Sequence, residues 1–137
     1  MAVNLTKVDH GAPNWENTIN DDFQALNQDT GVINLTMIGP LSGLYSDNKP
    51  SARRLNGEIH LNGGIKASEK ITAGSKVISM PAQFIPRDGW IITACMCTNM
   101  RTMFAVSVRG DGIYIDSELG VNMELDFSSI VYPGQGA

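Results

Sequence analysis

A single short helical pattern stands near the start of the chain, and only strand and turn patterns follow it. This contrast limits the fold more than any other feature. Within the segment 14–28 (NWENTINDDFQALNQ), apolar residues recur at spacings of four, four and three, which places them on one stripe of a helix: Trp15, Ile19, Phe23 and Leu26. Isolated helices shorter than about 12–15 residues are marginal in water. We therefore expect this helix to form because its stripe is buried.

Two partners can bury that stripe. The rest of the sequence has no second helical pattern, so the same helix of another copy of the chain can cover it. Alternatively, the stripe packs on the chain's own β-sheet. The first interpretation predicts self-association of the chain, and the second does not require it.

From residue 32 onward, short apolar segments alternate with turn residues. Asn56-Gly57 between two such segments is the strongest hairpin signal, because both turn positions favour positive φ. The run 90–97 (WIITACMC) is almost continuously apolar, which predicts a central strand covered on both faces. Further expected strands are 32–38, 53–55, 58–61, 65–67, 103–108, 113–116, 121–127 and 130–132.

Alternation within two of these strands predicts which side chains face the core. In 103–108, the residues Phe104, Val106 and Val108 share one face. The tetrapeptide 109–112 (RGDG) is expected to be a hairpin turn, and its adhesion-like RGD tripeptide is explained by that turn. After the turn, 113–116 places two isoleucines inward and Tyr114 and Asp116 outward.

The fold class that we predict is mainly β, with a short N-terminal helix followed by a C-terminal antiparallel β-barrel or sandwich head. Residues 1–31 form the N-terminal arm and helix, residues 32–50 form a short neck or linker, and residues 51–137 form the β-barrel head. The 137 residues suit one domain with a small appendage.

Charge and hydropathy exclude several classes of partner. The formal net charge is −4, and the densest basic site is Arg53-Arg54, which is too little to neutralise a run of phosphates. We expect no nucleic-acid partner. The first residues lack the apolar region of a signal peptide, and no apolar run reaches the roughly 18–20 residues of a membrane span, so we expect no export signal and no membrane insertion.

The two cysteines, Cys95 and Cys97, lie two residues apart on one expected strand, so both side chains point to the same face. Their spacing is near the upper limit for a disulfide. We interpret them as buried free thiols. His10 and His60 are far away in sequence, so we predict no metal site and no cofactor.

No pattern for catalysis is present in the sequence. The acidic residues of the C-terminal half lie in turns or at outward positions, where a solvated face explains them. Neither histidine is accompanied by a nucleophile motif, and the glycine-containing turns are too short for a phosphate loop. We therefore expect no catalytic residue and no enzyme.

Binding of a saccharide is a more open possibility, because such sites combine one or two aromatic faces with a few hydrogen-bonding groups. Trp90, Tyr114 and Tyr132 are the candidates for stacking, although Trp90 also fits a core position and Tyr114 also fits the cover of a neighbouring strand. The candidates for hydrogen bonds are Asn99, Arg101, Ser107 and Asp116.

The residues 11–28 (GAPNWENTINDDFQALNQ) resemble the N-terminal helical segment of receptor-binding, or lower baseplate, proteins of lactococcal-type siphophages. The shared features are the run 16–22 and an apolar-x-Ala-apolar-Asn pattern at 23–27. Downstream, Met80-Pro81 leading to 84–87, the strand 104–108 with a glycine-containing turn after it, and Tyr132-Pro133 are similar to the head domain of that family.

This resemblance implies a homotrimer. In the arrangement that it implies, three helices are expected to bundle into a shoulder, which docks on an upper baseplate protein of the phage tail through the N-terminal region. The resemblance further implies a neck that leads to three β-barrel heads, which are expected to bind host cell-wall polysaccharide near protomer boundaries. It also implies a place at the tail-tip baseplate of the virion, after assembly in the host cytoplasm.

The chain departs from the family pattern at one pair of residues. Relatives carry a ligand-contacting His-x-Asp pair where this chain has Ala105 and Ser107, which leaves the individual saccharide contacts open.

The alternative function is that of a structural baseplate or fibre connector whose barrel contacts only other virion proteins.

Overall fold

The computed structural model describes residue 19 and the ranges 29–45 and 48–135. Most of the predicted helix 14–28 lies outside the described residues, including Trp15, Phe23 and Leu26, so the helix and its trimeric bundle stay predictions. The described elements are β1 (Ile33–Asn34), β2 (Thr36–Met37), β3 (Leu41–Gly43), β4 (Ser51–Leu55), β5 (Glu58–Asn62), β6 (Gly64–Ala67), β7 (Lys76–Ser79), η1 (Ala82–Phe84), β8 (Trp90–Cys97), β9 (Thr102–Arg109), β10 (Gly112–Ile115), β11 (Glu124–Asp126) and β12 (Val131–Pro133).

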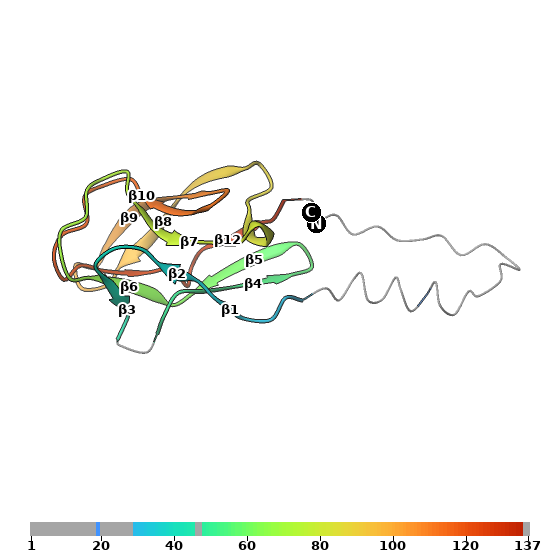
Figure 1. Ribbon diagram of the computed structural model, residues 1–137, viewed down its shortest axis with the longest axis horizontal. Helices are drawn as coiled ribbons and strands as arrows, with labels where there is room; N and C mark the ends of the chain where they lie inside the picture. Colours follow the sequence, from blue (N-terminus) through green and yellow to red (C-terminus); the bar gives the residue numbers. More distant parts are fainter. Residues whose placement is uncertain (1–18, 20–28, 46–47, 136–137) are drawn as a thin grey trace, which may run out of the picture.

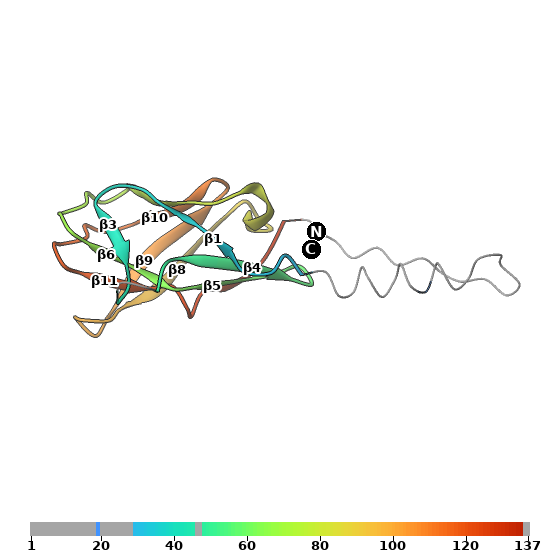
Figure 2. The same ribbon diagram turned by 60° about the horizontal axis from the view of Figure 1, so that its bottom comes forward.

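The strands form two sheets in which every pairing of the described strands is antiparallel. A four-stranded sheet has the order β1-β4-β5-β12, and an eight-stranded sheet has the order β2-β7-β10-β9-β8-β11-β6-β3. Within the described residues, the β4–β5 hairpin lies towards one end of the barrel, and β3 and β6 lie towards the other (Figures 1 and 2). The prediction of a mainly β fold with an antiparallel barrel is confirmed.

The eight-stranded sheet curves into a nearly closed barrel for a covalent reason. Its two edge strands, β2 and β3, are joined by only three residues, 38–40. Four steps of extended chain span at most about 14 Å. The two edges of a sheet eight strands wide are therefore held close together, which a flat sheet does not allow.

Residues 32–50, predicted as a neck, contribute strands to both sheets. β1 pairs with β4, β2 pairs with β7, and β3 pairs with β6. The barrel therefore begins well before residue 51. The roles assigned to the three predicted segments stay predictions.

The Asn56-Gly57 hairpin is confirmed. Asn56 has φ 52° and Gly57 has φ 83°, as expected for the turn that joins β4 to β5. Gly63, before β6, has φ 74°, and a Cβ there would lie 2.1 Å from the carbonyl oxygen of Lys49. Only glycine fits that position without moving the backbone.

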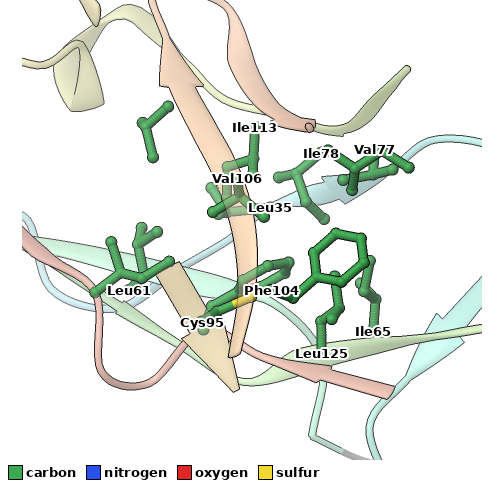
Figure 3. Close-up of a cluster of buried hydrophobic side chains, with 14 of the residues drawn as sticks. Leu35, Leu61, Ile65, Val77, Ile78, Cys95, Phe104, Val106, Ile113 and Leu125 are labelled. Carbon is green, nitrogen blue, oxygen red and sulfur yellow. The ribbon is translucent and has the colours of Figure 1, made fainter. Parts of the chain in front are cut away.

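The core fills the inside of the barrel. Phe104, Val106 and Val108 of β9 are buried, as are Ile113 and Ile115 of β10, which confirms the predicted faces of both strands. Figure 3 shows side chains of β7, β8, β9, β10 and β11 meeting in this cluster. Cys95 and Cys97 point into it as buried free thiols, as predicted.

The prediction that β8 is covered on both faces is wrong. Cys95 and Cys97 face the core, but Trp90, Ile92 and Met96 on the opposite face are exposed. No described segment packs over that outer face, so its apolar residues meet solvent. The continuous apolar run thus consists of one core-facing row and one surface row.

Candidate functional site

The outer face of β8, β9 and β10 gathers the aromatic and polar side chains of most interest. Trp90 pairs with Arg109 across β8 and β9, and Ile92 pairs with Ser107, which in turn pairs with Tyr114 of β10. Because side chains alternate along a strand, these residues share the outer surface in two neighbouring rows. The register of the strands therefore builds the site.

Arg109 is the centre of the first row. Its guanidinium carbon lies 4.2 Å from the ring centroid of Tyr114 and 5.5 Å from that of Trp90, so one cation contacts two aromatic rings. Trp90 keeps 53% of its surface exposed. Trp90 and Arg109 line a shallow hollow of about 330 Å³. The arrangement presents an aromatic face beside a positive charge.

A small network fixes the ring of Tyr114. The Tyr114 hydroxyl donates to Asp111, 2.9 Å from Oδ2, and Lys76 Nζ lies 3.1 Å from the same oxygen. The hydrogen bond from Tyr114, followed by that from Lys76, lowers the pKa of Asp111, and the bond to Asp111 raises the pKa of Tyr114. Asp111 therefore stays ionised and holds Tyr114 against Arg109.

Ser107 and Asp116 form a pair beside this network. Ser107 is fully buried, and its hydroxyl donates to Asp116 Oδ1 at 2.7 Å. The amide of Asp116 donates to the carbonyl of Ala105 at 3.1 Å. The side chain of Ser107 therefore orients Asp116, whose carboxylate is the exposed member of the pair.

Two other predicted residues lie at the far end of the β8–β9 hairpin. Arg101 is in the turn between the strands and has φ 54°. Eight residues separate it from Arg109, which is about 26 Å along a strand. In the same turn, the Asn99 side chain donates to the carbonyl of Asn122 at 2.6 Å, which ties two loops together.

Tyr132, the third predicted stacking residue, is buried. Only 3% of its surface is exposed, and its hydroxyl donates to the carbonyl of Phe84 at 2.8 Å. Its ring is therefore part of the core and has no surface for stacking. That prediction was wrong because Tyr132 lies on the inward face of β12, whose neighbours Val131 and Pro133 are exposed.

Arg109 is not among the site residues predicted from the sequence. It belongs to the predicted turn 109–112, and the structure does place a turn between β9 and β10. The missed signal was alternation: Ala105, Ser107 and Arg109 follow one another on the outer face of β9. Had the outward-facing row of β9 been continued from Ser107 to Arg109, it would have placed Arg109 opposite Trp90 on the neighbouring strand.

Beyond the hollow, the same face carries an apolar strip formed by Ile92, Met96 and Met103. Ile92 is 66% exposed and Met103 is 63% exposed, and Met96 pairs with Met103 across the strands. Exposed apolar residues gathered on one face mark interaction surfaces. The outer face thus combines a polar, aromatic end with an apolar one.

Two further observations concern the described residues as a whole. They contain no group of three or more His, Cys, Asp or Glu side chains arranged to hold a metal ion. None of their helices has the length and hydropathy needed to cross a membrane.

Comparisons with known proteins match this chain by fold. No protein-family model matches the sequence, and no curated protein matches it. Among solved structures, the crystal structure of the receptor binding protein (gp15) of Listeria phage PSA is similar, with a TM-score of 0.65 and 13% sequence identity. The match covers 95% of this chain and 82% of that chain. At this identity, the likeness shows a shared fold.

Proposed function

We propose that the chain is a bacteriophage tail receptor-binding protein whose β-barrel recognises a saccharide of the host cell wall. The observation that carries the proposal is the fold match to the receptor binding protein of Listeria phage PSA over 95% of this chain. The resemblance of residues 11–28 to phage receptor-binding proteins supports the same function on the evidence of sequence, whereas the match is one of fold. In this proposal, the protein is non-enzymatic and belongs to the virion tail tip.

The outer face of β8–β10 is the proposed saccharide site. The exposed ring of Trp90 offers an apolar surface to the C–H face of a sugar, and the adjacent hollow is shallow enough to admit a residue of a long polymer. Asp116 is an exposed acceptor on the same face, held by Ser107. Tyr114 lies between these two parts and is fixed by Asp111.

A homotrimer would compensate for the weak affinity of a single shallow saccharide site. A single shallow site with millimolar affinity contributes only about 4 kcal/mol of binding free energy. Linked copies on a repeating polymer raise the apparent affinity by about 10²–10⁴ without any new contact. We infer that residues 14–28 join the copies through Trp15, Ile19, Phe23 and Leu26, and that the N-terminal region docks on an upper baseplate protein.

The alternative is a structural connector that contacts only other virion proteins. The apolar strip of Ile92, Met96 and Met103 favours it, because an exposed apolar row suits a protein partner. Binding to cell walls separates the two functions, since a connector has no reason to bind saccharide.

The test is adsorption of the purified protein to a panel of purified bacterial cell walls that includes Listeria walls. The proposal predicts saturable adsorption that free wall polysaccharide blocks and that Trp90→Ala abolishes. Tyr45→Ala is the matched control, because Tyr45 is 71% exposed in the loop after β3 and should leave adsorption unchanged. Adsorption to no wall supports the connector, and release of reducing sugar identifies a wall-degrading enzyme.

The oligomeric state has its own test. Light scattering of the purified chain should give the mass of three copies at micromolar concentration. Phe23→Asp should lower that mass to one copy, because it places an unpaired charge in the buried stripe. A trimeric mass in that variant would mean that the stripe is not the contact between copies.

A further inference from the structure

Arg109 differs from Arg53 and Arg54 in the partners of its side chain. Arg53 pairs with Asp29, and Arg54 donates to the carbonyls of Gln83 and Gln135. Among the residues that the structure describes, the Arg109 side chain makes no hydrogen bond and no ion pair, and its Nε is buried without an acceptor. Its contacts are the two aromatic rings.

This arrangement leaves a positive charge with unused donors. A guanidinium has five N–H donors, and an aromatic ring accepts none of them as well as an oxygen does. The Nε is enclosed, so an acceptor in the hollow would pair with the terminal Nη groups, and hydrogen bonds to a charged donor are stronger than neutral ones. Arg109 and Trp90 line the hollow together, so an acceptor bound there reaches the guanidinium.

Neighbouring carboxylates do not supply that acceptor. Asp111 is already engaged by Tyr114 and Lys76. Asp116 is tied to Ser107, which lies two residues from Arg109 on the same face of β9, or about 7 Å along the strand. Among the described residues, neither carboxylate forms an ion pair with Arg109. The guanidinium therefore brings an unpaired positive charge to the hollow.

We propose that Arg109 binds an oxyanion carried by the saccharide ligand, while the sugar ring itself packs on Trp90. This inference rests on the proposed function and names the chemical class of its ligand. The planar fork of a guanidinium matches the two oxygens of a phosphate or a carboxylate. The anion is thus either a phosphate ester of the glycan or the carboxylate of a uronic acid.

The first experiment reads Arg109 directly. The Nε–Hε signal of Arg109 is identified by nuclear magnetic resonance through its absence in Arg109→Lys. Glucose 1-phosphate, glucuronate and methyl glucoside are then titrated separately to about 50 mM, a range that covers millimolar affinity. We expect at least one of the two anionic sugars to move this signal and to bind about ten-fold or more tightly than the neutral glucoside.

The variants sharpen the same experiment. Arg109→Gln should abolish the preference for the anionic sugar, and Arg109→Lys should retain only part of it because lysine lacks the fork. Lys66→Gln is the matched control: it removes one positive charge from an exposed position on β6 and should change nothing. Thermal unfolding of each variant establishes that it is folded.

Each result decides a separate point. A response to glucose 1-phosphate alone assigns a phosphate, and a response to glucuronate alone assigns a carboxylate. Equal affinity for the three sugars, or an Arg109 signal that none of them moves, overturns the inference. If the Arg109→Gln variant still adsorbs fully to cell walls, the anion is not part of recognition although the proposed function stands. Failure of the wild type to adsorb to any wall counts against the function itself.

Discussion

Removal of one hydroxyl group, in Tyr132→Phe, tests how the barrel holds the segment that leads to Trp90. The Tyr132 hydroxyl donates to the carbonyl of Phe84 at 2.8 Å, and both side chains are almost fully buried. Phe84 ends η1, and the chain then turns through 85–89 into β8. The hydrogen bond thus joins β12 to the corner that positions Trp90.

The magnitude of the effect follows from that burial. The variant keeps the ring but leaves the Phe84 carbonyl without its tyrosine donor, which costs about 1–3 kcal/mol of unfolding free energy. For a chain of this length, 1 kcal/mol corresponds to a shift of about 4 °C in Tm. We therefore expect Tm to fall by about 4–12 °C.

Thermal and urea denaturation followed by circular dichroism measure this loss. The control is Tyr45→Phe, in which the hydroxyl belongs to a side chain that is 71% exposed, and its Tm should not move. A Tm for Tyr132→Phe within 1 °C of the wild type, which is well below the expected fall, would show that the bond contributes no net stability. The account of the corner would then be wrong.

Three further predictions concern other parts of the barrel. Hydrogen bonding to Arg53 lowers the pKa of Asp29, so the ion pair stabilises the fold above about pH 4 and loses this effect as the pH falls through the folded-state pKa. The Asp29→Asn variant should therefore lose less stability than the wild type over that pH range in an acid-unfolding curve. An acid-unfolding curve that is unchanged by the substitution would contradict this prediction. Burial raises the pKa of Cys95 to about 12, so a thiol reagent at pH 8 should label it only on unfolding, and rapid labelling of the native protein would refute this. Gly63→Ala should lower the unfolding free energy by more than about 1 kcal/mol in urea denaturation, because of the positive φ and the 2.1 Å contact. Gly110→Ala, which has open space, should be neutral.

Local signals in the sequence were sufficient for much of the barrel. Asn56-Gly57 predicts its hairpin because positive φ at both turn residues is a property of the turn alone. Alternation in β9 and β10 predicts the core-facing residues because one face of each strand is buried. The burial of Cys95 and Cys97 follows from the same rule applied to β8.

Non-local arrangements could not be read in the same way. The pairing of β2 with β7 joins residues 41–43 positions apart, and that of β3 with β6 joins residues 22–26 positions apart. Residues 32–50 therefore looked like a linker. The run 90–97 was assigned two covered faces because apolar character alone does not reveal whether a second layer exists. In the described part of the chain, none covers it.

The candidate site was predicted in part. Trp90 and Tyr114 do share one face with Ser107 and Asp116, whereas Arg101 lies at the other end of the hairpin. Arg109 was not predicted as a site residue because the turn motif 109–112 already accounted for its presence in the sequence. Its importance follows only from the register that sets it beside Trp90 and from its lack of an acceptor.

The central claim is that the outer face of β8–β10 binds host saccharide. Its most direct test is to titrate the isotopically labelled protein with solubilised cell-wall polysaccharide and to map the residues whose signals change. The account predicts changes at Trp90, Arg109 and Tyr114, with the opposite end of the hairpin at Arg101 unaffected. Signal changes confined to other faces of the barrel would contradict this claim. So would the absence of any signal change with a polysaccharide that blocks adsorption of the protein to cell walls.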